Sequence, residues 1–171
     1  MQIFKSLIIL LMVTVLFIGC QNTNKQEVNA EKCKALLIGT DSDLSRVFQS
    51  EKASVTTDSE ISEYDEFNVI LVNSKYIDRV DFEKLRIYIE SGKDVYFYNL
   101  LSTKEIEKGL FGSENYETIK EASNDSFEIA RIYLGEAKGI QMVQISCKYD
   151  EKNTDSLFKN LLILILKYTN L

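Results

Sequence analysis

Short apolar runs that alternate with helical patterns constrain this fold more than any other feature of the sequence. Each run is long enough for one buried strand. The strands are expected at residues 33–39, 53–57, 67–73 and 94–100. Helical spacing separates them, most clearly at 81–91, where Gly92 is placed to end the helix. Strand–helix alternation predicts a parallel sheet with helices on both faces, and we expect Tyr96 and Tyr98 on the last run to pack in its core.

The second half of the chain has a different pattern. Residues 116–120, 127–134 and 140–148 have nearly alternating polarity, which favours antiparallel strands at a sheet edge. A helical pattern beginning at Thr154 then continues to the end of the chain. The sequence therefore predicts a three-layer α/β fold: a mostly parallel sheet with an antiparallel C-terminal edge and a closing helix.

The first twenty residues are typical of an exported protein. Residues 7–18 are apolar except for Thr14, a run suited to a signal peptide and short for a membrane span. The following Phe17-Ile18-Gly19-Cys20 resembles the lipobox of bacterial lipoproteins, with Phe17 in place of the usual Leu. The resemblance implies a signal peptide at 1–19 and lipid on Cys20. The protein would then be held on the extracytoplasmic face of the cell membrane.

The residues after Cys20 divide into two parts. Residues 20–32 are polar and have almost nothing to bury, which predicts a flexible lipidated tether. Residues 33–171 suit a single α/β domain. The membrane, reached through the lipid, is thus the expected partner of the chain.

Composition excludes several functions. The sequence has no histidine, which removes Ser-His-Asp and Cys-His nucleophiles and His-ligated metals. Its formal charge is −6, and no basic stretch is interleaved with aromatics, so we expect no nucleic-acid partner. No sequence feature predicts a cofactor or a catalytic residue.

Two cysteines remain in the predicted domain, Cys33 and Cys147. After export they could form a disulfide if their Cα atoms lie about 4.4–6.8 Å apart. They could equally be two small buried apolar side chains. The sequence leaves both interpretations open.

The order of elements resembles the class I glutamine amidotransferase-like superfamily. The resemblance lies in residues 62–72, 81–92, 94–99, 138–145 and 157–168. It implies a flavodoxin-like sheet. Catalytic members carry a Cys nucleophile after the fourth strand and a His partner, whereas residues 99–103 here contain no Cys and the chain has no His. The resemblance therefore implies the fold without amidotransferase activity.

Polar residues end or follow two of the expected strands. They are Thr40, Asp41, Ser42, Asp43, Asn73 and Ser74. Ligands in open α/β sheets bind outside the carboxyl ends of strands, so this set is the candidate ligand site. The simpler interpretation is that Ser42 or Asp43 caps the following helix. The two carboxylates would repel a flavin phosphate.

The same residues support an alternative function. Asp41-Ser42-Asp43 and the later Ser74 are similar to motifs of haloacid dehalogenase phosphatases, although Leu44-Ser45 replaces the Gly-Thr of that family. A divalent-metal-dependent hydrolase using Asp41 and Asp43 is therefore one alternative. Another is an accessory lipoprotein of a membrane transporter or assembly complex, with an envelope protein as partner. The main expectation is a non-catalytic, lipid-tethered binding or interaction domain.

Overall fold

The computed structural model describes residues 29–58, 66–112, 126–136, 139–148 and 153–169, which form one mixed sheet between two layers of helices. The sheet has the strand order β2-β1-β3-β4-β5-β6. Its strands are β1 (Lys34–Ile38), β2 (Ser54–Asp58), β3 (Val69–Asn73), β4 (Asp94–Tyr98), β5 (Ser126–Leu134) and β6 (Ile140–Lys148). The first four are parallel, whereas β5 runs antiparallel to β4 and β6 antiparallel to β5. The predicted α/β fold with an antiparallel C-terminal edge is confirmed.

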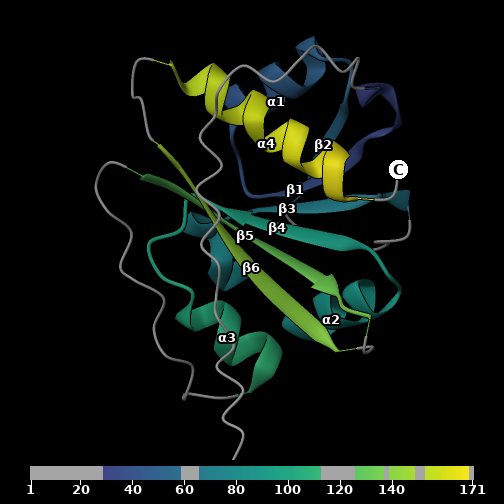
Figure 1. Cartoon of the computed structure of the whole chain (residues 1–171), viewed down its shortest axis with the longest axis vertical. Helices are drawn as coiled ribbons and strands as arrows, with labels where there is room; N and C mark the ends of the chain where they lie inside the picture. Colours follow the sequence, from purple (N-terminus) through teal and green to yellow (C-terminus); the bar gives the residue numbers. More distant parts are fainter. Residues whose placement is uncertain (1–28, 59–65, 113–125, 137–138, 149–152, 170–171) are drawn as a thin grey trace, which may run out of the picture.

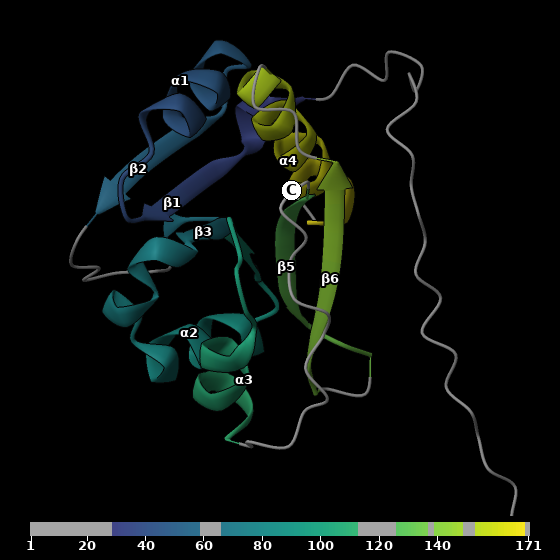
Figure 2. The ribbon, with the colours of Figure 1, turned by 90° about the vertical axis from the view of Figure 1, so that its left-hand side faces the viewer.

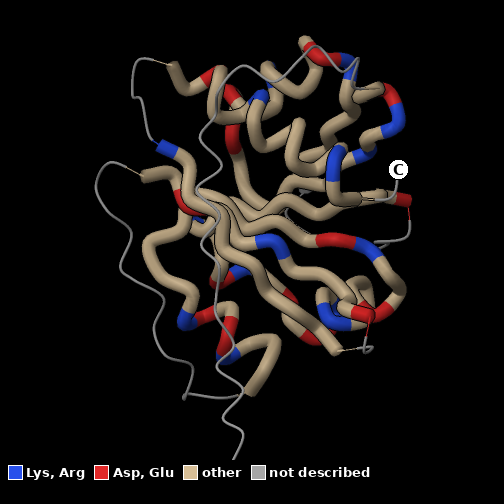
Figure 3. The backbone as a smooth tube through the Cα atoms, in the orientation of Figure 1, with Lys and Arg blue, Asp and Glu red and all other residues tan. Residues whose placement is uncertain are grey.

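Helices cover both faces of this sheet (Figures 1 and 2). On one face lie α1 (Ser42–Ser50) and the closing helix α4 (Thr154–Tyr168), which pack against each other. On the other face lie α2 (Phe82–Glu90) and α3 (Lys104–Phe111). Charged residues of both signs are interspersed along the described chain (Figure 3).

The central strands β3 and β4 are apolar except for one end residue each, Asn73 and Asp94. Every residue of β3 and β4 is buried. Along β3, Val69 and Leu71 point into the core under α1 and α4, whereas Ile70 and Val72 point into the core under α2 and α3. A strand covered on both faces has no solvent side, so polar alternation disappears.

Both ends of the described fold lie at the same edge of the sheet. The short 3₁₀ turn η1 (Ala30–Lys32) leads into the amino end of β1. At the other end of the chain, the Thr169 hydroxyl donates to Asp94, the first residue of β4, at 3.2 Å. Ala30 is buried, so the fold begins slightly before the predicted boundary at residue 33.

One local expectation is wrong. The residue that caps α1 is Asp41, whose carboxylate accepts the Leu44 amide, and not Ser42 or Asp43. Helix α3 continues past Gly109 to Phe111. Gly109 fits there because the Phe82 ring occupies the position that a Cβ would take.

Several expectations fall outside the described residues. They concern the signal peptide at 1–19, lipidated Cys20, most of the tether and the strand at 116–120. Among the helices that the structure does describe, none combines the length and apolar character needed to cross a membrane.

Both domain cysteines are buried. Cys33 precedes β1, and Cys147 lies on β6, four strand positions away in the sheet order. At about 4.8 Å per step, the two strands are roughly 19 Å apart across the sheet, which is far beyond the span of a disulfide. The interpretation that fits this arrangement is two separate buried thiols.

We expect the two thiols to differ in reactivity. Burial raises the pKa of the Cys33 thiol to about 11, so almost no thiolate is present at pH 8. Cys147 lies on the last strand of the described sheet, where local opening costs less. Iodoacetamide treatment followed by peptide mass spectrometry should show Cys147 modified first and Cys33 modified only in urea. Equal rates in the native protein would contradict this prediction.

Candidate functional site

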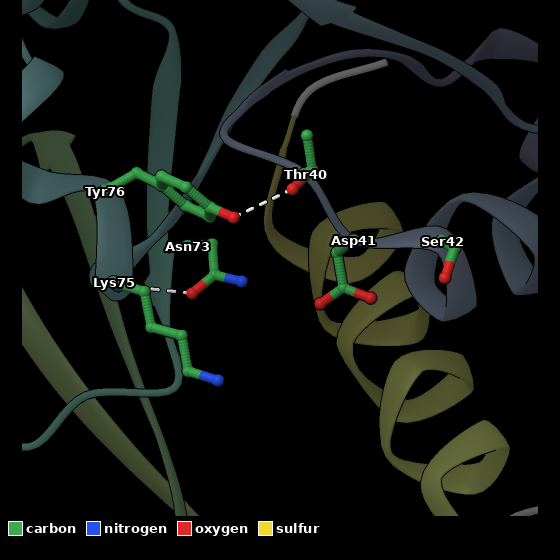
Figure 4. Close-up of a pocket in the computed structure, with 6 residues that line it drawn as sticks. All are labelled: Thr40, Asp41, Ser42, Asn73, Lys75 and Tyr76. Atoms are coloured by element: carbon green, nitrogen blue, oxygen red, sulfur yellow. Dashed lines mark hydrogen bonds between the residues drawn. The ribbon is translucent and has the colours of Figure 1, made fainter.

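The candidate site lies where the strand order reverses. Strand β1 is flanked by β2 and β3, so the chain segments that follow β1 and β3 leave the same sheet edge toward opposite faces. In open α/β sheets this divergence creates a crevice that is the usual place for a ligand. A pocket of about 380 Å³, open to solvent, is found here. Figure 4 shows its lining residues: Thr40, Asp41, Ser42, Asn73, Lys75 and Tyr76.

Asp41 is held in place by the start of α1. Its Oδ1 accepts the Leu44 amide at 3.0 Å, and its backbone carbonyl accepts the Ser45 hydroxyl at 2.9 Å. A carboxylate in this position satisfies a free amide of the first helical turn and complements the positive end of the helix. The cap therefore fixes a negative charge at the pocket wall.

A buried tyrosine connects Asp41 to the core. The Tyr98 hydroxyl donates to Asp41 Oδ2 at 3.1 Å, and its ring packs edge-on against Phe158 of α4, with 6.1 Å between the ring centroids. Burial, reinforced by the charge of Asp41 and its hydrogen bond, raises the Tyr98 pKa well above its usual range. The Asn73 side chain, hydrogen-bonded to the same hydroxyl, acts in the opposite direction. Tyr98 therefore remains a protonated donor that orients the carboxylate.

The segment after β3 forms the other wall. The Asn73 Oδ1 accepts the Lys75 amide at 3.2 Å and so caps η3 (Ser74–Arg79). This turn places Tyr76 beside the loop after β1, where its hydroxyl and the Thr40 hydroxyl are hydrogen-bonded at 2.8 Å. The Thr40–Tyr76 bond joins the two walls above the pocket (Figure 4).

Four of the six predicted site residues line this pocket: Thr40, Asp41, Ser42 and Asn73. The other two do not. Asp43 forms an exposed ion pair with Arg46 at 3.3 Å, and the Ser74 hydroxyl donates to the Tyr98 carbonyl at 2.8 Å. Asp43 follows the cap and lies in the first helical turn, where Arg46 three residues later is its natural partner.

The metal-dependent alternative receives no geometric support from these contacts. Asp41 and Asp43 are adjacent to Ser42 in sequence, but their carboxylates bind different partners: Leu44 and Tyr98 for Asp41, and Arg46 for Asp43. Within the described ranges, no three His, Cys, Asp or Glu side chains are grouped so that they could hold a metal ion.

Three residues that form or support the pocket were not predicted from the sequence. Lys75 and Tyr76 line the pocket, and the Tyr98 hydroxyl orients Asp41 from below although its ring is in the core as expected. The sequence signal that could have indicated Lys75 and Tyr76 is that the polar residues continue past Ser74. The turn that carries Tyr76 back to the loop after β1 depends on the Asn73 cap, which the sequence pattern does not show.

The pocket has one acidic and one basic side chain. Asp41 is half-buried and Lys75 is exposed. No ion pair within 4.0 Å joins these two described residues, and Lys75 has no acidic partner elsewhere in the described part of the chain. The remaining lining groups are hydroxyls and one carboxamide, so the surface is suited to hydrogen bonding.

Comparison with known proteins assigns no family. No protein-family model matches the chain, and no curated protein matches it. Among solved structures, the formyltransferase PseJ from Anoxybacillus kamchatkensis aligns over 79% of this chain and 74% of its own, with 14% identity and a TM-score of 0.38. The CcbJ methyltransferase from Streptomyces caelestis aligns over 80% and 74%, with 11% identity and a TM-score of 0.26. We take no function from likenesses this weak.

Proposed function

We propose that this chain is an extracytoplasmic lipoprotein, held on the cell membrane by lipid on Cys20, whose α/β domain binds a small polar ligand without transforming it. The observation that carries the binding part is the polar pocket at the reversal of strand order. The lipobox-like Phe17-Ile18-Gly19-Cys20 supports the membrane part.

The state of the pocket side chains supports binding over catalysis. A nucleophile or general base needs a reactive group free to approach a substrate. Asp41 is already bound to an amide and to a phenol, and the Ser74 hydroxyl is turned toward a backbone carbonyl. No histidine exists in the sequence to activate the hydroxyls of Thr40 or Ser42.

The membrane attachment is tested by replacing the lipidated cysteine. In cells grown with an alkyne-tagged fatty acid, the wild-type chain should carry the label and sediment with membranes. The Cys20→Ala variant should lose the label, while Cys33→Ala should keep it. A wild-type chain without label, or a labelled Cys20→Ala variant, would reject the proposed lipidation.

The binding function is tested by obstructing the pocket. Ser42→Trp places a large side chain at the pocket wall, and Gln49→Trp places the same side chain at an exposed position of the same helix. Full-length protein is screened by NMR against a library of polar metabolites that includes sugars, polyols and amino acids. A metabolite that binds the wild-type protein should bind Gln49→Trp with the same affinity. It should bind Ser42→Trp at least about tenfold more weakly, because the tryptophan side chain occupies space that the ligand needs. Equal binding to both variants would place the site elsewhere.

A further inference from the structure

Two opposite charges face the same pocket without neutralising each other. Asp41 enters from the loop after β1 and Lys75 from the segment after β3, with Asn73 between them (Figure 4). Asp41 is immobilised by the Leu44 amide and the Tyr98 hydroxyl, yet each carboxylate oxygen still has a second lone pair. Lys75 offers three N–H donors on a flexible stem.

The pocket is poorly built for ligands that stack. The Tyr76 ring lies against Gly39, where an added Cβ would be 2.2 Å from Cδ2, and the Arg79 guanidinium lies 4.8 Å from the ring centroid. These contacts occupy the ring, and only the hydroxyl of Tyr76 joins the polar network with Thr40. A nucleobase or flavin ring would therefore compete with Arg79 and Gly39 for the Tyr76 ring.

The pocket is also poorly built for phosphate. An anion would normally bind the free amides at the amino end of α1. Asp41 already occupies that end and accepts the Leu44 amide at 3.0 Å. Its negative charge would repel a phosphate dianion at the same place.

We propose that the ligand is a zwitterion, namely a free α-amino acid or a short peptide with free ends. This inference rests on the proposed binding function. The ligand ammonium binds Asp41, and the ligand carboxylate binds the Lys75 ammonium on the opposite wall, away from the negative charge of Asp41. Each contact is a charge-assisted hydrogen bond, the stronger class of polar contact in proteins. A single amino acid supplies both charges on neighbouring atoms, whereas a sugar supplies neither.

The test compares ligands that differ in one charge. Full-length ¹⁵N-labelled protein is titrated with L-serine, with L-serinamide, which lacks the carboxylate, and with N-acetyl-L-serine, which lacks the ammonium. L-glutamine and L-alanyl-L-alanine replace serine in parallel series, and D-glucose is the uncharged polar control. The readout is the shift of the backbone amides of Thr40, Ser42 and Lys75. In an open site, we expect millimolar dissociation constants.

The expected result is a preference for both charges. At least one of the three zwitterions should shift the pocket amides and bind at least about tenfold more tightly than its two single-charge analogues, since one charge-assisted hydrogen bond accounts for about that factor. In the Lys75→Gln variant, the zwitterion should no longer bind more tightly than its amide analogue, which lacks the carboxylate. Lys84→Gln, at an exposed position on α2, should retain it.

Other outcomes separate the two proposals. Binding of D-glucose at these amides without zwitterion binding would overturn the ligand class and leave the pocket function standing. Zwitterion binding that is unchanged in Lys75→Gln would also overturn the inference. If neither these probes nor the metabolite library shifts the pocket amides, both proposals fail.

Discussion

Replacing Arg131 with alanine is expected to lower the free energy of unfolding by about 3–5 kcal/mol. The Arg131 Nε donates to Asp94 Oδ2 at 2.8 Å, and its Nη2 donates to the Tyr168 carbonyl at 2.9 Å. The side chains of Arg131 and Asp94 are only 16% and 8% exposed. Loss of the guanidinium would leave a buried carboxylate without a counter-charge.

The groups around Arg131 cannot replace the interactions that it makes. Its guanidinium carbon lies 4.3 Å from the Tyr133 ring centroid and 5.1 Å from that of Tyr168. Among the described side chains, Asp94 would keep the neutral donors Tyr96, at 3.4 Å, and Thr169, at 3.2 Å. Cation–π contacts and the Tyr168 carbonyl bond would be lost together with the ion pair. The variant should therefore also loosen the end of α4.

The effect is measured as the shift in the midpoint of urea unfolding, provided that the slope of the unfolding free energy against urea concentration does not change. Two variants serve as controls. Arg46→Ala removes an arginine whose side chain is 57% exposed and paired with Asp155, and should shift the midpoint far less. The double variant Asp94→Val/Arg131→Met removes both charges and should recover most of the loss, since apolar replacement of a buried pair is often neutral. A midpoint for Arg131→Ala equal to that of Arg46→Ala would show that Asp94 is hydrated and that our account is wrong.

Replacing Gly39 with alanine is expected to lower the free energy of unfolding by about 2–6 kcal/mol and to break the Thr40–Tyr76 hydrogen bond. Gly39 has φ +103°, a conformation that L side chains rarely adopt, which accounts for about 1–3 kcal/mol. An added Cβ would also lie 2.2 Å from the Tyr76 ring. Forcing that ring aside adds a comparable overpacking cost.

Two variants separate these causes. Gly92 also has a positive φ, +87°, but no atom lies within 4 Å of the position that a Cβ would take there, so Gly92→Ala should show the backbone cost alone. In the Gly39→Ala/Tyr76→Ala double variant the steric cost should disappear, so the combined effect should be smaller than the sum of the single effects. Strict additivity in urea unfolding would mean that the ring does not obstruct position 39.

The fold was largely predictable because burial on both faces leaves a clear sequence pattern. The runs that became β3 and β4 are apolar apart from their end residues Asn73 and Asp94, because helices cover both sides of those strands. The candidate site was predictable only where residues end a strand or come shortly after it, as for Asn73 and Asp41. Tyr98 shows the limit: its position on a strand predicts a core residue, but its hydroxyl reaches a loop that is 57 residues away in sequence.

The start of helix α1 was harder to predict than the strands for a related reason. Several polar residues in a row can all serve as the cap, and the choice depends on tertiary partners. Asp41 is favoured because Tyr98 binds its second oxygen, and Asp43 is then free to pair with Arg46. Neither partner can be placed from the local sequence alone.

The common location of the two ends of the fold has a practical and a biological consequence. Residue 29 and Thr169 both lie at the amino edge of the parallel strands, and the pocket opens at the carboxyl edge. A sensor chip or fusion protein attached at either end would leave the pocket exposed to the medium. In the proposed lipoprotein, the same polarity would place the lipid-bearing end and the pocket on opposite sides of the domain.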